Sequence, residues 1–432
     1  MRRILDSFTY ALLFSLSTAL PATSPAIAAR SGLVASFPLP PSQDSFYTAP
    51  TGYESAAPGT ILRLREAVGN LTSIYNASSA AYNILYRTTD AQYQPAWAVT
   101  TLFVPSHPSS DALLSYQIPY NTADVDHSPS YVLGSELATG LILSDINSAL
   151  NHGWFVNVPD FEGPSASFGS GVAEGHATLD SVRAVLSAGF GLSSDARYAM
   201  WGYSGGSIAS EWAAELQVQY APELNFSGVA LGGLVPNGTT ILHTIDGTPA
   251  AGLIPSFLIG VMKQYPAAYH YLVSNLKASG PYNATGFLAV QNMSYLEAAV
   301  AFMNQSVLND YFINGTSLIQ QPIIQRVFDV DGLMGYHGVP QMPTFMYKAT
   351  HDEYSPVGDT DSLVARYCNA GANILYQRNR AGNHLDEETN GDARAFDWLN
   401  AALNGTLMMQ RGCTIQNVTV DISSHAPFTL PP

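Results

Sequence analysis

The sequence contains little cysteine and little charge. It has 2 cysteines and 12% charged residues in a chain of 432, and its formal net charge is −16. The 17 lysines and arginines form no cluster, and nucleic acid or an anionic membrane surface would repel so acidic a chain. We therefore expect no nucleic acid partner. The 47% of hydrophobic residues predict a globular protein with a large buried core.

The two cysteines are not part of a C-x-x-C motif, which disfavours zinc sites and redox sites. An isolated pair in an exported protein favours one disulfide, here between Cys368 and Cys413. The chain-entropy model values the closure of such a loop at about 4 kcal/mol. A reactive thiol and an intermolecular bridge are the alternatives.

Long hydrophobic runs are also missing. The apolar residues 10–20 follow the basic start M-R-R and precede small residues that end in A-I-A, which is the pattern of a secretory signal peptide over residues 1–28. A short membrane anchor is the alternative. A later run, residues 252–262, is too short to span a bilayer and is interrupted by Pro255. We expect a secreted, extracellular protein without stable membrane insertion, and the sequence does not give its oligomeric state.

Export agrees with the number of N-glycosylation sequons. In an exported chain, ten Asn-x-Ser/Thr sites predict a glycoprotein with these positions mostly at the surface. The candidates are Asn70, Asn76, Asn225, Asn237, Asn283, Asn292, Asn304, Asn314, Asn404 and Asn417.

Strand-like and helix-like segments alternate along much of the chain. This alternation predicts an α/β fold with a mostly parallel central sheet and helices on both faces. Helices are expected at residues 179–188 and 207–217. Strands are expected at residues 80–88, 97–105, 112–118, 154–159, 197–201, 226–233, 343–348 and 373–377.

One stretch lacks strand signals. Residues 236–330 are rich in Ala, Leu, Tyr and Met at helical spacing, most clearly at residues 253–276 and 296–312. We interpret residues 236–330 as a helical cap inserted between two parts of a core, residues 29–235 and 331–432. A separate helical domain is the alternative.

Three glycines surround one serine in the segment R-Y-A-M-W-G-Y-S-G-G-S. Gly202, Gly205 and Gly206 would weaken a helix or a strand, and they are typical of a turn too tight for side chains. An apolar strand precedes this turn and a helix follows it, which is the arrangement of a nucleophile elbow around Ser204. The alternative is a glycine turn with an incidental serine, because G-x-S-x-G is common by chance.

A serine nucleophile needs a general base and an acid that orients it, and in a doubly wound sheet both follow the serine. Asp352 comes just after a predicted strand, and His384 comes in a Gly-containing loop after the next one. We predict Asp352 as the acid, with Glu353 as second choice, and His384 as the base. Histidines before the serine, His176 among them, would violate this order. The alternatives are solvent-facing carboxylates and a structural histidine.

The reaction also requires two donors for an oxyanion. One should be the backbone N–H of Gly205, and the other usually comes from a loop after an early strand. The segment S-Y-Q-I-P-Y-N supplies such a loop and places Asn121 in it. An ordinary Asn-containing turn is the alternative.

Together these segments resemble the fungal secretory lipase family. The resemblance covers about residues 45–415 and rests on SYQIPYN, VPDFEGP, ATLDSVRA, GYSGGS and HDEYSP in that order, and on the late cysteine pair. It implies an α/β-hydrolase fold with a helical cap inserted after the elbow strand. It also implies Ser204, Asp352 and His384 as the triad and Gly205 as one oxyanion donor.

Two features depart from the family pattern. Asn121 stands where the family usually has Asp, which is tolerated if the donor is a backbone N–H and alters activity or its pH profile if a protonated carboxyl takes part. Only 19 residues follow Cys413, which is short for the C-terminal flap of true lipases and favours a more open site.

These observations predict a secreted serine hydrolase that cleaves carboxylic esters of lipids or small molecules through an acyl-enzyme, with no metal or organic cofactor. The alternative to a triacylglycerol lipase is a short-acyl esterase (deacetylase) of an acetylated small molecule or secondary metabolite. A transacylase or a peptidase is less favoured. A non-catalytic adhesion module with a hydrolase fold is a remote alternative, which a serine-directed fluorophosphonate probe would distinguish.

Overall fold

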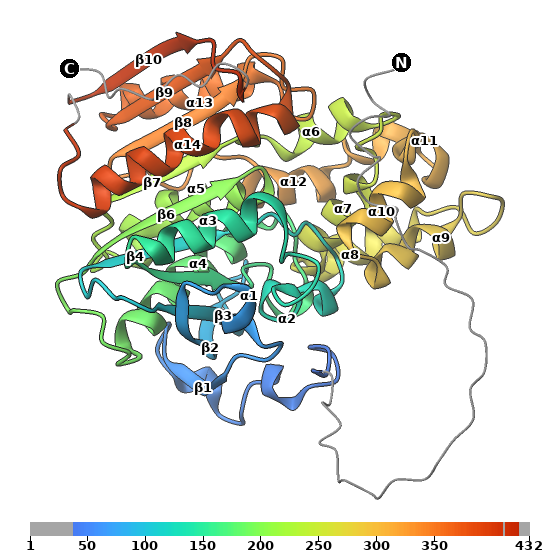
Figure 1. The fold of residues 1–432 in the computed structure, drawn as a ribbon. Coiled ribbons are helices and arrows are strands. Elements are labelled where there is room, and N and C mark those ends of the chain that lie inside the picture. The colour runs from blue at the N-terminus through green and yellow to red at the C-terminus, as the bar shows by residue number, and fades with distance from the viewer. Residues whose placement is uncertain (1–37, 409–410, 423–432) are drawn as a thin grey trace, which may run out of the picture. The chain divides into compact units, whose positions relative to one another are not determined.

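The computed structural model describes residues 38–408 and 411–422 of the chain. The predicted signal peptide, residues 1–28, lies outside these described residues. The described residues contain ten strands that form a single sheet in the order β1-β2-β3-β5-β4-β6-β7-β8-β9-β10 (Figure 1). The strands are β1 (Ile61–Glu66), β2 (Ser78–Thr89), β3 (Pro95–Pro105), β4 (Ala112–Gln117), β5 (Phe155–Pro159), β6 (Arg197–Tyr203), β7 (Gly228–Gly232), β8 (Thr344–Ala349), β9 (Ile374–Asn379) and β10 (Cys413–Val418).

The sheet is mostly parallel, which confirms the predicted α/β fold class. The neighbouring strands from β5 to β10 all pair in parallel. The antiparallel pairs join β1, β2, β3 and β5 at one end of the sheet. Central strands such as β4 and β7 are buried along their whole length, as expected where helices cover both faces. The edge strands β1 and β10 had no counterpart among the expected strands.

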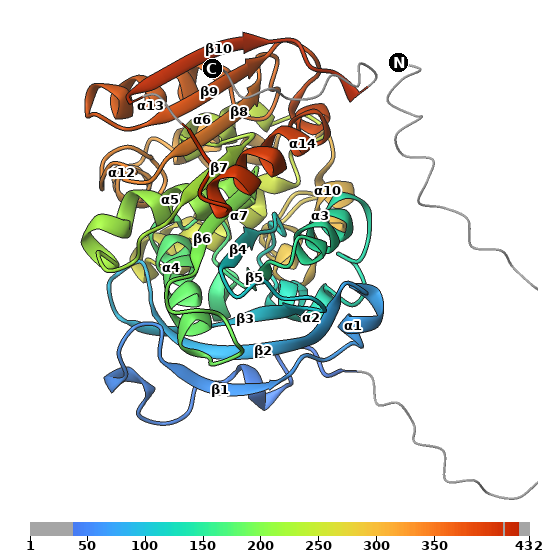
Figure 2. The ribbon, with the colours of Figure 1, turned by 60° about the vertical axis from the view of Figure 1, so that its left-hand side comes forward.

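Helices cover both faces of the sheet (Figure 2). α4 and α5 pack against each other and against one face, while α3 and α14 pack against the other. The helices of the described residues are α1 (Leu71–Ile74), α2 (Pro129–Val132), α3 (Gly140–Asn151), α4 (Gly171–Ser187), α5 (Gly205–Tyr220), α6 (Gly238–Ile245), α7 (Leu253–Lys263), α8 (Pro266–Ser274), α9 (Ala284–Leu288), α10 (Tyr295–Phe302), α11 (Val307–Tyr311), α12 (Pro322–Asp331), α13 (Val357–Asn369) and α14 (His384–Leu403).

Seven of these helices, α6 to α12, fall between β7 and β8, and we call residues 238–331 the helical insertion. In Figure 1 the insertion lies beside the sheet, to its right. The two long helical segments expected here are each broken in the structure. The first divides into α7 and α8, because Pro266 begins a new helix, and the second divides into α10 and α11.

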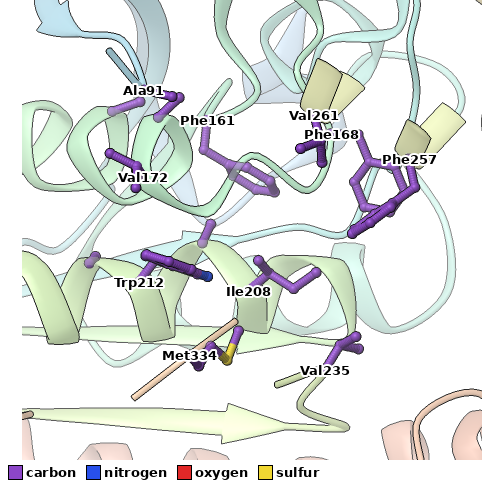
Figure 3. Packing of buried hydrophobic residues seen from close by; sticks show 14 of the residues in the cluster. Ala91, Phe161, Phe168, Val172, Ile208, Trp212, Val235, Phe257, Val261 and Met334 are labelled. Atoms are coloured by element: carbon purple, nitrogen blue, oxygen red, sulfur yellow. The ribbon is translucent and has the colours of Figure 1, made fainter. Parts of the chain in front are cut away.

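The larger core lies between the sheet, α4, α5 and the helical insertion. Figure 3 shows the packing of this core, in which Trp212 and Ile208 project from α5 into the same cluster as Val172 of α4. The rings of Phe168 and Phe257 meet edge to face with centroids 5.6 Å apart. These residues join the insertion to the rest of the core through apolar contacts, the main source of stability in such packing.

A disulfide joins Cys368 on α13 to Cys413 at the start of β10, as expected from the cysteine count. It ties the edge strand β10 to a helix that packs beside β9. The two alternatives, a reactive thiol and an intermolecular bridge, are therefore wrong.

Candidate active site

The sequence-predicted site residues all follow the carboxyl ends of parallel strands. Asn121 comes after β4, Ser204 and Gly205 come after β6, Asp352 comes after β8, and His384 comes after β9. Because these strands run in parallel, their carboxyl ends lie at one edge of the sheet. Ligand sites of open α/β sheets occur at this edge.

Ser204 occupies the tight turn between β6 and α5. Its backbone has φ 50° and ψ −120°, a conformation that residues other than glycine rarely adopt. A β-carbon at Gly202 would lie 2.2 Å from the carbonyl oxygen of Gly206, and one at Gly206 would lie 1.9 Å from the carbonyl oxygen of Gln117. The glycines are therefore a steric requirement of the turn that holds Ser204.

His384 makes a hydrogen bond with each of its ring nitrogens. Its Nε2 lies 2.8 Å from Ser204 Oγ and its Nδ1 lies 2.7 Å from Asp352 Oδ2. The expected loop position is wrong, since His384 is the first residue of α14. Asn383 caps this helix by accepting a hydrogen bond from the backbone N–H of Asp386. The helix start fixes the backbone that carries the imidazole.

Asp352 is held by a buried lysine that no sequence motif had indicated. Lys348 lies on β8 and its Nζ donates to Asp352 Oδ2 at 2.8 Å and to the carbonyl oxygen of Leu234 at 2.7 Å. Burial raises the pKa of Asp352, but the hydrogen bond from His384 and the Lys348 ammonium outweigh it and hold this pKa well below its usual range. Asp352 therefore stays ionised beside the imidazole.

Two further residues fix the backbone of His384. Glu353, the second choice for the acid, accepts the backbone N–H of His384 at 2.8 Å, and it is Asp352 that bonds the imidazole. Tyr203, next to Ser204 in the elbow, donates its hydroxyl to the carbonyl oxygen of His384 at 2.5 Å. Burial raises the pKa of Tyr203, so its hydroxyl remains a donor.

Asn121 lies directly against Gly205. It has φ 47°, and its Oδ1 is buried without a hydrogen-bond partner. A β-carbon at Gly205 would lie 1.9 Å from this Oδ1. The structure thus brings the predicted oxyanion residues into contact, beside Ser204.

The segment V-P-D-F-E-G-P supports the loop that carries Asn121. Burial raises the pKa of the Glu162 carboxyl. The backbone N–H groups of Asn121 and Thr122 lower this pKa, but by less than burial raises it. The Glu162 N–H donates to the Tyr120 hydroxyl at 2.7 Å. Asp160 accepts two hydrogen bonds from Ser130, at the start of α2. The motif therefore has a place beside the site that the sequence did not reveal.

An apolar pocket opens at Ser204. It holds about 370 Å³ of empty space, the part open to solvent included. Hydrophobic side chains of the core and the helical insertion surround it, including Phe168, Ile208, Leu253 and Phe257. Such a lining suits the hydrocarbon part of a ligand.

The structure places most of the sequons at the surface. Asn237 and Asn283 are half-buried and cap α6 and α9 through their side-chain oxygens. The exposed ones are Asn70, Asn76, Asn225, Asn292, Asn304, Asn314, Asn404 and Asn417.

The described residues contain neither a membrane-spanning helix nor a cluster of metal ligands. No helix within residues 38–408 or 411–422 has the length and the apolar character needed to cross a membrane. The same part of the chain contains no group of three or more His, Cys, Asp or Glu side chains placed to hold a metal ion.

The sequence matches the secretory lipase family over residues 131–411. It is 48% identical to the trichothecene C-3 esterase of Fusarium sporotrichioides, over 96% of this chain and 94% of that protein. It is 37% identical to lipase A of Arthroderma benhamiae, over 88% of this chain and 83% of that protein.

A solved structure is similar over nearly the whole fold. The closed state of Candida antarctica lipase A superposes with a TM-score of 0.81, over 90% of this chain and 92% of that one, at 27% identity.

Proposed function

The chain belongs to the secretory lipase family and is a carboxylic ester hydrolase, and on this premise we propose that Ser204, His384 and Asp352 are its catalytic triad. The hydrogen-bonded series from Ser204 Oγ through His384 to Asp352 Oδ2 carries this proposal. The distances along this series suit proton transfer, because each donor lies within hydrogen-bond reach of its acceptor.

In the first half of the reaction, His384 Nε2 takes the proton of Ser204 as Oγ attacks the ester carbonyl carbon. The carbonyl oxygen becomes an oxyanion, and Asp352 stabilises the imidazolium. The intermediate then expels the alcohol, which leaves with the proton from His384. The product that remains is an acyl ester of Ser204.

In the second half, water attacks the acyl-enzyme while His384 accepts its proton. Collapse of the second intermediate breaks the bond to Ser204 Oγ, which takes the proton back from the imidazolium. Both halves need Asp352 ionised, and Lys348 favours that state. Lys348 is thus a positioning residue, three hydrogen bonds away from the nucleophile.

Two groups beside Ser204 serve as donors to the oxyanion. The Gly205 N–H lies at the start of α5, and Asn121 contacts Gly205. An amide is a donor at every pH, unlike the carboxyl that the family usually carries at this position. Removing one such donor lowers kcat about 10²- to 10³-fold in other serine hydrolases.

For the substrate, we propose a small molecule that carries a short acyl ester, acetate first among them. The apolar pocket at Ser204 offers a lining for the acyl group. The name of the Fusarium sporotrichioides relative, trichothecene C-3 esterase, makes an esterified trichothecene the first compound to test. The helical insertion would then act as a cap over the site, in a protein exported by the signal peptide of residues 1–28.

A lipid ester is the second candidate, because α10 exposes apolar side chains. Leu296 and Val300 on α10 are each 70% exposed, and their spacing of four residues places them along one side of the helix. Such a surface suits contact with a lipid interface.

Initial rates on p-nitrophenyl esters from acetate to palmitate test the proposal, with Ser204→Ala as the blank. We expect rates confined to acetate and butyrate, and acetyl release from an acetylated trichothecene. Rates that rise toward palmitate would favour the lipid ester. Hydrolysis retained by Ser204→Ala would overturn the triad.

A further inference from the structure

One face of the His384 imidazole is covered by a tyrosine ring. The Tyr354 ring is stacked on it, with centroids 4.6 Å apart and planes 17° apart, whereas the Tyr203 ring is tilted by 52°. Tyr354 is half-buried and also lines the pocket at Ser204. Its backbone N–H donates to Asp352 Oδ1 at 2.9 Å. Tyr354 therefore contacts two members of the proposed triad.

A residue of the helical insertion holds this ring in place. Tyr295 is the first residue of α10, and its hydroxyl interacts with the hydroxyl of Tyr354. Burial is the main reason why the pKa of each hydroxyl is raised, so both stay protonated at neutral pH. The contact connects the insertion, through Tyr354, to the imidazole.

We propose that Tyr354 is a positioning residue for the base His384. We also propose that Tyr295 couples the position of the helical insertion to the orientation of the His384 imidazole. This inference rests on the proposed function of the triad. A stacked aromatic ring attracts an imidazolium, and that cation forms only as Ser204 loses its proton. The contact is therefore stronger in the transition state than in the ground state, and it accelerates the chemical step. It also fixes the plane of the imidazole, with Nε2 toward Ser204.

Several charged groups also face this imidazole. Asp352 accepts from Nδ1, with Lys348 beyond it, and Glu353 accepts the backbone N–H. Glu388 interacts with it from the next turn of α14. All of these groups remain when the Tyr354 ring is replaced, so a change in the pH profile reports the loss of stacking.

Tyr354→Leu tests the role of the ring. We expect kcat for p-nitrophenyl acetate to fall about 3- to 30-fold, with a smaller change in KM. The acid limb of the kcat/KM profile should move to lower pH, because the imidazolium loses its stacked partner. Phosphonylation by a fluorophosphonate should slow in parallel. Tyr354→Phe keeps the ring, so its kcat should fall no more than about threefold.

Tyr295→Phe and the double variant Tyr295→Phe/Tyr354→Phe test the coupling. Each single change removes the same hydroxyl contact, so the double variant should be no slower than either single variant. Tyr336→Leu is the matched control, because Tyr336 is 58% exposed and packs against Arg366. Its kinetics should match those of the parent enzyme.

Wild-type kcat and pH profile in folded Tyr354→Leu would overturn the proposal, as would equal losses in Tyr354→Leu and Tyr354→Phe. Additive losses in the double variant would overturn the role of Tyr295. Full hydrolysis by Ser204→Ala would instead overturn the triad itself. The melting temperature of each variant separates a loss of folding from a loss of rate.

Discussion

Two buried histidines lie in different parts of the molecule and differ in their hydrogen bonds. His384, at the carboxyl edge of the sheet, is 1% exposed, and His176, on α4, is 0% exposed. Each imidazole is stacked on a tyrosine, His384 on Tyr354 at 4.6 Å and His176 on Tyr220 at 3.9 Å. Both nitrogens of His384 are hydrogen-bonded to side chains of the proposed triad, whereas neither ring nitrogen of His176 has a side-chain partner.

The difference teaches that burial and stacking do not make a histidine catalytic. Burial lowers the pKa of His176 to about 4, although the backbone of Asp90 and Thr89 acts in the opposite direction. That imidazole stays neutral at pH 7. At His384, Asp352 compensates the positive charge and Ser204 supplies the proton, so the proposed site can pass a proton through a buried ring.

The largest effect should separate the two histidines directly. We expect His384→Gln to lower kcat about 10⁴- to 10⁶-fold, because the base is lost, with KM and the fold little changed. His176→Gln is the matched control and should keep kcat within about threefold, since it lies outside the site. Ester hydrolysis and melting temperature measure both variants. A strong loss of kcat in folded His176→Gln, or none in His384→Gln, would break the comparison.

The next largest effect concerns Asp352, the carboxylate that is bonded to His384 and has no equivalent at His176. Asp352→Asn should lower kcat about 10⁴-fold by disturbing the tautomer of His384. It should also lower the free energy of unfolding by about 3–5 kcal/mol, because the buried Lys348 ammonium loses its partner. Kinetics and urea unfolding measure the two effects.

A second substitution separates these two roles of Asp352. Lys348→Met in the Asp352→Asn background removes the unpaired charge, so we expect stability to recover while kcat stays low. If kcat recovered as well, the orientation of His384 would not depend on the carboxylate.

A third prediction compares unpartnered polar atoms. Asn121 Oδ1 and the His176 nitrogens are all buried without a side-chain partner, but only Asn121 lies beside Ser204. Asn121→Ala should lower kcat about 10²- to 10³-fold if its side chain is a donor to the oxyanion. Asn121→Asp should lose activity as the pH rises through the pKa of the new carboxyl, because an ionised carboxylate cannot donate to the oxyanion. Unchanged kcat in Asn121→Ala would leave the backbone N–H as the donor.

The smallest effect concerns stability and pH. The pKa of His176 is about 4 when folded and about 6.5 when unfolded, so the unfolded chain binds more protons between these values. Its contribution to stability is therefore present above pH 6.5 and is lost as the pH falls toward 4. We expect His176→Phe to reduce this acid-dependent loss by up to about 3 kcal/mol in urea unfolding at pH 7 and pH 4. An unchanged difference between the two pH values would contradict the assignment.

Much of the candidate site could be predicted because its residues follow a rule of chain order. In a parallel sheet, loops after successive strands meet at one edge, so Ser204, Asp352 and His384 could be chosen from their positions after β6, β8 and β9. Glycine spacing identified the elbow for a steric reason that the close approaches at Gly202 and Gly206 make explicit.

The supporting residues could not be predicted, because their roles depend on which side chains the fold brings together. Lys348 lies in an apolar strand and gives no local sign that it meets Asp352. The stacking of Tyr354 on His384 depends on how the loop after β8 is placed relative to the start of α14. The edge strands β1 and β10 are half-exposed and mixed in composition, so they lack the apolar pattern of the central strands. The break at Pro266 did have a sequence signal, the proline itself.

The most direct test of the central claim is active-site labelling with a fluorophosphonate, followed by mass spectrometry of the labelled peptides. The account predicts one label per chain, on Ser204, with loss of ester hydrolysis in proportion to labelling. It also predicts little labelling of His384→Gln and normal labelling of His176→Gln. Label on another residue, or hydrolysis that survives complete labelling of Ser204, would contradict it.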